Sequence, residues 1–129
     1  MVWAGSGKEI LTMRPEKIEA FRAAADAWLN EAQRVELSQR IRVDAAFDAT
    51  YMYCRVVLAG ADEKLEHPHQ EVLTGAAERL GWSPQVMGTA RQYLEEWHAP
   101  FRGDNRYDAL LALALRLKAA VAADIKTQH

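Results

Sequence analysis

The chain contains a single cysteine, Cys54, among its 129 residues. One cysteine excludes an intramolecular disulfide framework and a metal site built from cysteines alone, and it fits a reducing compartment. No apolar run approaches the ~18–20 residues that a membrane-spanning helix needs. The first residues also lack the basic and apolar stretches of a secretory signal. We therefore expect a cytoplasmic protein that does not enter a membrane.

An excess of charge of one sign is also missing. Sixteen Lys and Arg residues stand against 18 Asp and Glu residues, which gives a formal net charge of -2 and a pI of about 6.1. This balance does not favour a general nucleic-acid binder, although it leaves a local basic patch open. Half of the residues are apolar, as is typical of a globular domain. We expect one domain over residues 14–129 and a flexible N-terminal tail over residues 1–13.

Strand patterns are absent too, and apolar residues instead recur at the three- and four-residue steps of an α-helix. The spacing predicts a first helix of about 20 residues that begins near Pro15 and includes Val35 in its apolar stripe. A second helix is predicted to follow the cap residue Ser38 and to stop at Gly60.

The middle of the chain predicts two more helices. A polar loop over residues 60–69 precedes a short third helix, which Gly81 ends. Its inward residues are Val72, Leu73, Ala76, Ala77 and Leu80. The pair Ser83-Pro84 is a cap followed by a proline, and it predicts the start of a fourth helix. Gly88 lies inside that helix, where we expect a kink or a close contact with another helix.

The last predicted helix carries apolar side chains on two sides. It begins after a cap at Asp104 or Asn105 and extends to Ile125. Leu111 and Leu115 lie outside the centre of its main apolar stripe. A second apolar side indicates either a central helix or a contact with another chain, and we favour a homodimer over a monomer.

Short connections between these helices predict an all-α fold, an up-and-down antiparallel bundle of four to five helices. Cys54 falls on the inward side of the second helix, so we expect it to pack in the core rather than to act as a nucleophile. Aromatic residues at helical spacing, such as Tyr51 and Tyr93, are expected in the core as well, although stacking on bases would also suit them.

Arg91 and His98 are the first candidates for chemistry. Seven positions make nearly two helical turns, so both side chains point about the same way, ~10 Å apart along the axis. Together they could bind a phosphodiester and move a proton near neutral pH. The competing interpretation is structural. Arg91 lies four residues before Glu95, as in common surface ion pairs, and His98 lies near a helix C-terminus, where a cation is favourable.

A second candidate is the pair His67 and His69, which flank Pro68 among acidic residues. Two imidazoles and a carboxylate can hold zinc or a related metal. One His-Pro-His without a remote partner defines no site, however. We therefore expect solvated or capping histidines and predict no metal and no cofactor.

The order of these features resembles the HEPN-like helical domains over about residues 21–121. Residues 42–51 are similar to the long second helix of that family, and the segment around His67 is similar to the loop that leads into its short third helix. Residues 90–98, followed by residues 107–111 and a final apolar helix, resemble its C-terminal part. The resemblance implies a prokaryotic homodimer with a partner protein such as a nucleotidyltransferase.

The resemblance also implies two alternative functions. Catalytic members carry an Arg, four to six residues and then a His at a dimer groove, and they are metal-independent ribonucleases. Arg91 and His98 fit that spacing, whereas Gln92 stands where those members usually have Asn or another small polar residue. Many relatives lack nuclease activity. We favour a non-catalytic binding or interaction module for a partner protein or a nucleotide-like ligand, with RNA as another possible ligand. The alternative is a toxin-like ribonuclease that uses Arg91 and His98.

Overall fold

The computed structural model describes residues 15–58, 68–96 and 106–128. Within them it contains five α-helices, one short 3₁₀ helix and no strand. The elements are α2 (Pro15–Ala32), α3 (Gln39–Val57), α4 (Pro68–Leu80), η2 (Pro84–Met87), α5 (Gly88–Glu95) and α6 (Arg106–Gln128). The predicted all-α helical bundle is confirmed. The predicted tail over residues 1–13 and the predicted stop at Gly60 lie outside the described residues.

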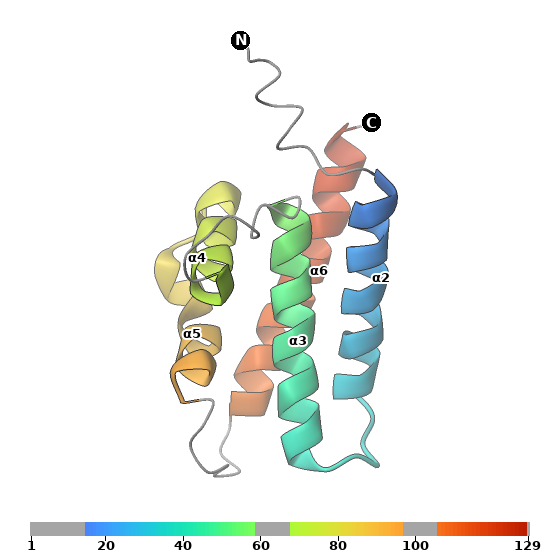
Figure 1. Ribbon diagram of the computed structural model, residues 1–129, viewed down its shortest axis with the longest axis vertical. Helices are drawn as coiled ribbons and strands as arrows, with labels where there is room; N and C mark the ends of the chain where they lie inside the picture. The colour runs from blue at the N-terminus through green and yellow to red at the C-terminus, as the bar shows by residue number, and fades with distance from the viewer. Residues whose placement is uncertain (1–14, 59–67, 97–105, 129) are drawn as a thin grey trace.

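Helix α3 lies at the centre of the bundle and contacts α2, α4, α5 and α6. Figure 1 shows α2 on one side of α3 and the pair α4 and α5 on the other side. The predicted cap at Ser38 is confirmed, because its Oγ accepts a hydrogen bond from the backbone N–H of Ile41 at 3.2 Å. That bond satisfies one of the free N–H groups at the helix start.

The end of α2 differs from the prediction. The backbone N–H groups of Gln33 and Arg34 bond to carbonyls three residues back, at Asn30 and Glu31. Such tight turns end a helix, so α2 stops at Ala32. The prediction that Val35 belongs to the buried stripe was wrong, since its side chain is 81% exposed beyond the helix.

A hydrogen-bonded cluster joins the end of α2 to the starts of α3 and α6. The Arg42 guanidinium donates to the Ala32 carbonyl at 3.0 Å and to the Tyr107 hydroxyl at 2.8 Å. The Tyr107 hydroxyl in turn donates to the Ala32 carbonyl at 2.9 Å. Because the starts of α3 and α6 meet the end of α2, both run antiparallel to α2 and in the same direction as each other.

Helix α4 begins at Pro68, inside the segment predicted as a polar loop over residues 60–69, so His69 lies in its first turn. It runs in the same direction as α3, because His69 lies beside Tyr51 and Gly75 lies beside Leu58 near the end of α3. Gly81 ends α4 as predicted. Its φ of 72° lets the next N–H, of Trp82, bond back to the Ala77 carbonyl at 2.9 Å.

The predicted fourth helix is divided in two. Ser83 caps it as expected, accepting from the N–H of Gln85, but residues 84–87 form the 3₁₀ helix η2. The α-helix α5 starts only at Gly88, so the backbone changes its winding where a kink was predicted. The alternative of a close helix contact at Gly88 was wrong, because a Cβ built there meets no atom of the described residues within 4 Å.

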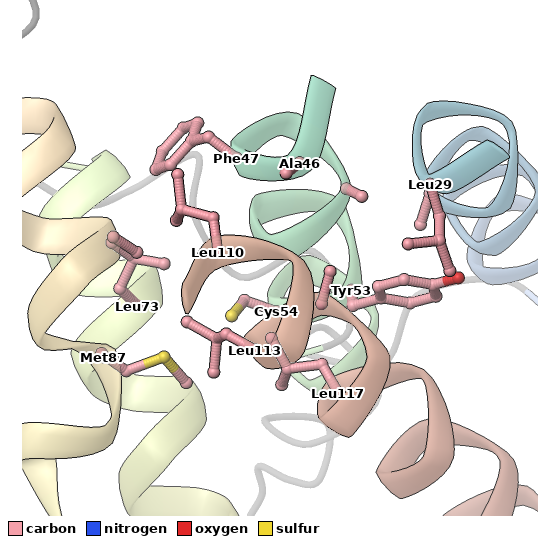
Figure 2. Close-up of a cluster of buried hydrophobic side chains, with 14 of the residues drawn as sticks. Leu29, Ala46, Phe47, Tyr53, Cys54, Leu73, Met87, Leu110, Leu113 and Leu117 are labelled. Atoms are coloured by element: carbon pink, nitrogen blue, oxygen red, sulfur yellow. The ribbon is translucent and has the colours of Figure 1, made fainter. Parts of the chain in front are cut away.

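The core is formed by side chains from every described helix. Figure 2 shows its centre, where α2, α3, α6 and the α4–η2 segment converge. The largest fully buried side chains are Leu29, Thr50, Tyr53, Cys54, Val72, Leu73, Met87, Leu110 and Leu117. Thr50 satisfies its hydroxyl by donating to the carbonyl of Ala46 at 2.9 Å. The predicted burial of Cys54 is confirmed.

The two sides of α6 differ in their surroundings. Leu110, Leu113, Leu117 and Val121 are buried, as the main stripe predicted. Leu111 packs against the core from its edge, whereas the Leu115 side chain remains 42% exposed. Only part of the second apolar side is therefore covered within the chain, and the homodimer remains a prediction.

Candidate functional site

A hollow of about 380 Å³ opens between α3, α4 and α5. Its lining comes from three elements: Phe47 and Asp48 on α3, His69 on α4, and Tyr93 and Leu94 on α5. We call it the aromatic hollow. Its size lies within the range of small-ligand sites, which are typically ~300–1,000 Å³ and mostly apolar with a few polar groups. Helices α4 and α5, which supply His69, Tyr93 and Leu94, lie on the side of α3 opposite α2 (Figure 1).

Aromatic rings form the wall of the aromatic hollow. The rings of Phe47 and Tyr93 stack with centroids 4.4 Å apart and an interplanar angle of 18°. Tyr51 is stacked with Phe47 at 6.3 Å, and the His69 imidazole tilts against Tyr51 at 4.9 Å. Phe47 is buried and Tyr93 is half-buried, whereas His69 is exposed at the edge. The rings therefore run from the core to the surface.

Asp44 and Asp48 lie one helical turn apart on α3, and within the described residues only Asp44 of the two is paired. Its Oδ1 accepts a hydrogen bond from the Tyr93 hydroxyl at 2.6 Å, and its Oδ2 lies 3.7 Å from the Arg40 guanidinium. Burial, followed by this bond to a carboxylate, raises the pKa of Tyr93, so the phenol stays protonated as the donor. Tyr93 is thereby held in place against Phe47.

Asp48 is the unusual carboxyl of the aromatic hollow. Among the described residues, no side chain or N–H group donates a hydrogen bond to it. Burial and then the nearby negative charge of Asp44 raise the pKa of Asp48 from 3.8 to about 6. At pH 7 it is still mostly ionised. Its carboxylate therefore offers two acceptor oxygens beside aromatic rings, and a strongly perturbed acid in a concave site is a functional candidate.

Arg91, predicted as a site residue, lies on α5 three positions before Leu94, which lines the aromatic hollow. It is exposed on α5, and its Nε donates to the Gln70 side chain at 3.2 Å. Gln70 follows His69 on α4, so this bond joins α4 to α5. An arginine carries five N–H donors, of which this contact uses one. Its predicted partner His98 lies outside the described residues.

The second predicted pair is divided in the same way. His69 contributes to the aromatic hollow through its ring, and His67 lies outside the described residues. Within residues 15–58, 68–96 and 106–128, no group of three or more His, Cys, Asp and Glu residues is placed to hold a metal ion. Burial raises the pKa of Cys54 to about 12, so at neutral pH it is a protonated thiol and not a nucleophile.

The sequence interpretation did not identify Asp48, Phe47 or Leu94 as site residues. One signal was present: Asp44 and Asp48 are the two acids of α3, at a four-residue step on either side of the buried Phe47. Two carboxyls one turn apart on a half-buried helix repel each other unless something pairs them. The contributions of α4 and α5 had no local signal, because tertiary packing alone brings them to α3.

No protein-family model matches the chain, and no curated protein or solved structure matches it either. In the described part of the chain, no helix combines the length and the apolar character needed to cross a bilayer.

Proposed function

We propose that this chain is a non-catalytic binding module that takes a nucleotide-like ligand in the aromatic hollow. One observation carries the proposal. Asp48 is an ionisable carboxyl without a hydrogen-bond donor among the described residues, and it borders a concave site walled by stacked rings. A ligand with a flat face and N–H donors would suit such a site. A nucleobase has both features.

The dimensions and charges of the aromatic hollow suit the parts of a nucleotide. A base that enters the hollow meets aromatic side chains in its lining, and base–aromatic stacking contributes about 1–3 kcal/mol per base. Asp48 lies at the edge of that position and accepts N–H groups. Arg91 then lies on the outer side, where the phosphate of the ligand would be, and guanidinium groups bind phosphate well.

The HEPN-like resemblance supports a binding module as well. It also supports a homodimer, a nucleotidyltransferase-like partner protein and a cytoplasmic location as parts of the same proposal. The exposed Leu115 on α6 is a residue that such a dimer would cover. Analytical ultracentrifugation of the wild-type chain and of Leu115→Glu tests the dimer, which the charged variant should weaken.

Titration with nucleotides tests the binding function. We expect adenosine or guanosine 5′-monophosphate to shift the amide NMR signals of residues 47, 48, 69, 93 and 94. Arg91→Ala should weaken binding of the monophosphate about tenfold and leave binding of the unphosphorylated nucleoside unchanged, because only the phosphate reaches Arg91. The matched control is Arg34→Ala, which removes an exposed arginine at the α2–α3 turn. Binding of a partner peptide at these residues, with no nucleotide binding, would contradict the nucleotide assignment.

The second candidate function is the metal-independent ribonuclease. It is supported by the exposure of Arg91 on α5, where a scissile phosphate would have access to the guanidinium. In that case Arg91 holds the phosphate and His98 transfers a proton while the ribose 2′-hydroxyl attacks. RNA cleavage in EDTA that yields cyclic phosphate ends, and that disappears in Arg91→Ala and in His98→Ala, would replace the binding function. Intact RNA with folded protein supports the binding module.

A further inference from the structure

Within the aromatic hollow, we infer that Asp48 selects a guanine base among the nucleobases. The inference rests on the proposed function, and it adds the identity of the base that the aromatic hollow recognises. It follows from the hydrogen-bonding capacity of one side chain and from the surroundings that leave that capacity unused.

The two acids on α3 differ in their hydrogen-bond partners. Asp44 is engaged by the Tyr93 hydroxyl at 2.6 Å and by Arg40 at 3.7 Å. Asp48, one turn further, lines the hollow and receives no hydrogen bond from the described parts of the chain. Its two oxygens are therefore available to donors from a ligand. A half-buried carboxylate without donors is costly, and a ligand that supplies two of them gains the most.

The edges of the bases differ in the order of their hydrogen-bond donors and acceptors. Guanine presents two adjacent donors, N1–H and the N2 amino group, which match the two oxygens of one carboxylate in a bidentate pair. Adenine and cytosine each place an acceptor nitrogen beside their amino group, and that acceptor would face a carboxylate oxygen. Uracil has one donor between two acceptors. Guanine is therefore the base whose edge fits Asp48 without a repulsive contact.

The lining residues also suggest how a base would be oriented in the hollow. Phe47 and Asp48 are neighbours on α3, and both line the hollow together with His69 and Tyr93 from the flanking helices. A flat base that enters the hollow meets these side chains and points one edge toward α3, where Asp48 is. The side of the hollow near Gln70 and Arg91 is then left for the sugar and phosphate. The arrangement gives Asp48 the base and Arg91 the phosphate.

Isothermal titration calorimetry of the full chain with four nucleoside monophosphates tests this assignment. We expect GMP to bind at least about tenfold more tightly than AMP, since a bidentate pair discriminates by about 1–3 kcal/mol. IMP lacks the N2 amino group and should fall between the two. Asp48→Asn should bind GMP at least about tenfold more weakly and gain affinity for XMP, because the Asn amide donates to the carbonyl oxygen at C2 of xanthine.

Two controls separate a specific role from a structural one. Glu19→Gln makes the same charge change on an exposed position of α2, across α3 from the hollow, and should leave all four affinities unchanged. A change of preference from GMP to XMP requires recognition by Asp48, and loss of folding cannot produce it.

A short RNA containing one guanine, compared with GMP, shows whether the base comes from RNA or from a free nucleotide. Tighter binding of either one supports guanine recognition.

The outcomes distinguish this inference from the function on which it rests. Equal binding of AMP and GMP at the same lining residues, or Asp48→Asn that keeps its preference for GMP over XMP, overturns the guanine assignment and leaves nucleotide binding intact. If none of the four nucleotides shifts the NMR signals of residues 47, 48, 69, 93 and 94, the proposed function fails and the guanine assignment fails with it.

Discussion

The hydroxyl of Tyr93, near the end of α5, donates a hydrogen bond of 2.6 Å to the carboxylate of Asp44, near the start of α3. This bond crosses 49 positions of the chain and joins two helices that run in opposite directions. Because the same Tyr93 ring stacks on Phe47, the bond fixes the position of Tyr93 in the lining of the aromatic hollow. The relationship makes Tyr93 a positioning residue whose two roles can be separated.

Tyr93→Phe removes the hydroxyl and keeps the ring. We expect a loss of about 1 kcal/mol in the free energy of unfolding, the usual net contribution of one hydrogen bond at a half-buried position. Tyr93→Ala also removes the stack on Phe47 and should lose about 3 kcal/mol. Urea unfolding followed by circular dichroism measures both. If Tyr93→Phe is as unstable as Tyr93→Ala, the hydroxyl bond and not the stack dominates, contrary to this account.

Asp48 should make the protein less stable at neutral pH than in mild acid. Its pKa is about 6 in the folded chain and near 3.8 when unfolded. Between these values the folded state binds more protons, so the contribution of Asp48 to stability decreases as pH rises through this window and stays low above it. Asp48→Asn should therefore stabilise the chain at pH 7.5, by about 1 kcal/mol once solvent screening of a half-exposed group is allowed for.

The measurement is the difference in unfolding free energy between wild type and Asp48→Asn at several pH values. The other charged or titratable groups around this carboxyl are Arg40 and Asp44 on α3, His69 on α4 and Tyr93 on α5, and they are the same in both proteins. Their titration therefore largely cancels in the difference. A difference that does not change between pH 4 and pH 7 would show that Asp48 titrates normally. The predicted gain in stability together with loss of guanine binding is typical of a residue retained for function.

Helical periodicity predicted most of the fold because it depends on local spacing. Ser38, Gly81 and the Ser83-Pro84 pair each act through their own backbone, so their effects on the helix ends are visible in sequence. Val35 was misplaced because the last turn of α2 tightens to bonds three residues back, and the apolar spacing contains no sign of that change. Whether a periodic residue still lies within its helix is a question of capping.

The aromatic hollow was harder to predict because no single helix contains it. Arg91 was identified from its spacing to His98, yet its observed contact is with Gln70, 21 positions earlier on another helix. Asp48 becomes distinctive only when α4 and α5 close over α3 and leave it without a donor among the described residues. Periodicity shows which side of α3 is buried. It does not show which buried polar group remains unpaired.

Arg42 should be a stability residue and not an anion-binding one. Its guanidinium joins Ala32 and Tyr107 and lies 4.5 Å from the centre of the Tyr107 ring. Arg42→Ala should lose about 2–3 kcal/mol, because two charge-assisted bonds and a stacking contact disappear together. Arg42→Lys should recover less than half of that loss, since an ammonium cannot reproduce the planar two-way contact. Thermal unfolding checks both variants.

The control for Arg42 is Arg34→Ala at the same α2–α3 turn. Arg34 forms an ion pair with Glu36 at 2.7 Å, and both side chains are more than half exposed. Exposed pairs contribute about 0–1 kcal/mol, so this variant should remain close to wild type. Equal destabilisation by Arg34→Ala and Arg42→Ala would mean that the cluster around Ala32 adds nothing beyond an ordinary surface contact.

Cys54 should react with thiol reagents only when the bundle opens. Its side chain is fully buried in the core cluster of Figure 2, and burial holds its pKa near 12, so access and thiolate fraction both oppose reaction. We expect labelling by a disulfide reagent at pH 8 to be slow in buffer and rapid in denaturing urea.

Cys54→Ala should lose about 1–2 kcal/mol through lost packing, and Cys54→Ser about 1–3 kcal/mol through a buried hydroxyl. Each variant should open more often, so labelling of a cysteine introduced at the buried Ala46, elsewhere on α3, should accelerate in the same order as the loss of stability. Rapid stoichiometric labelling of the folded wild type at Cys54 would contradict its burial.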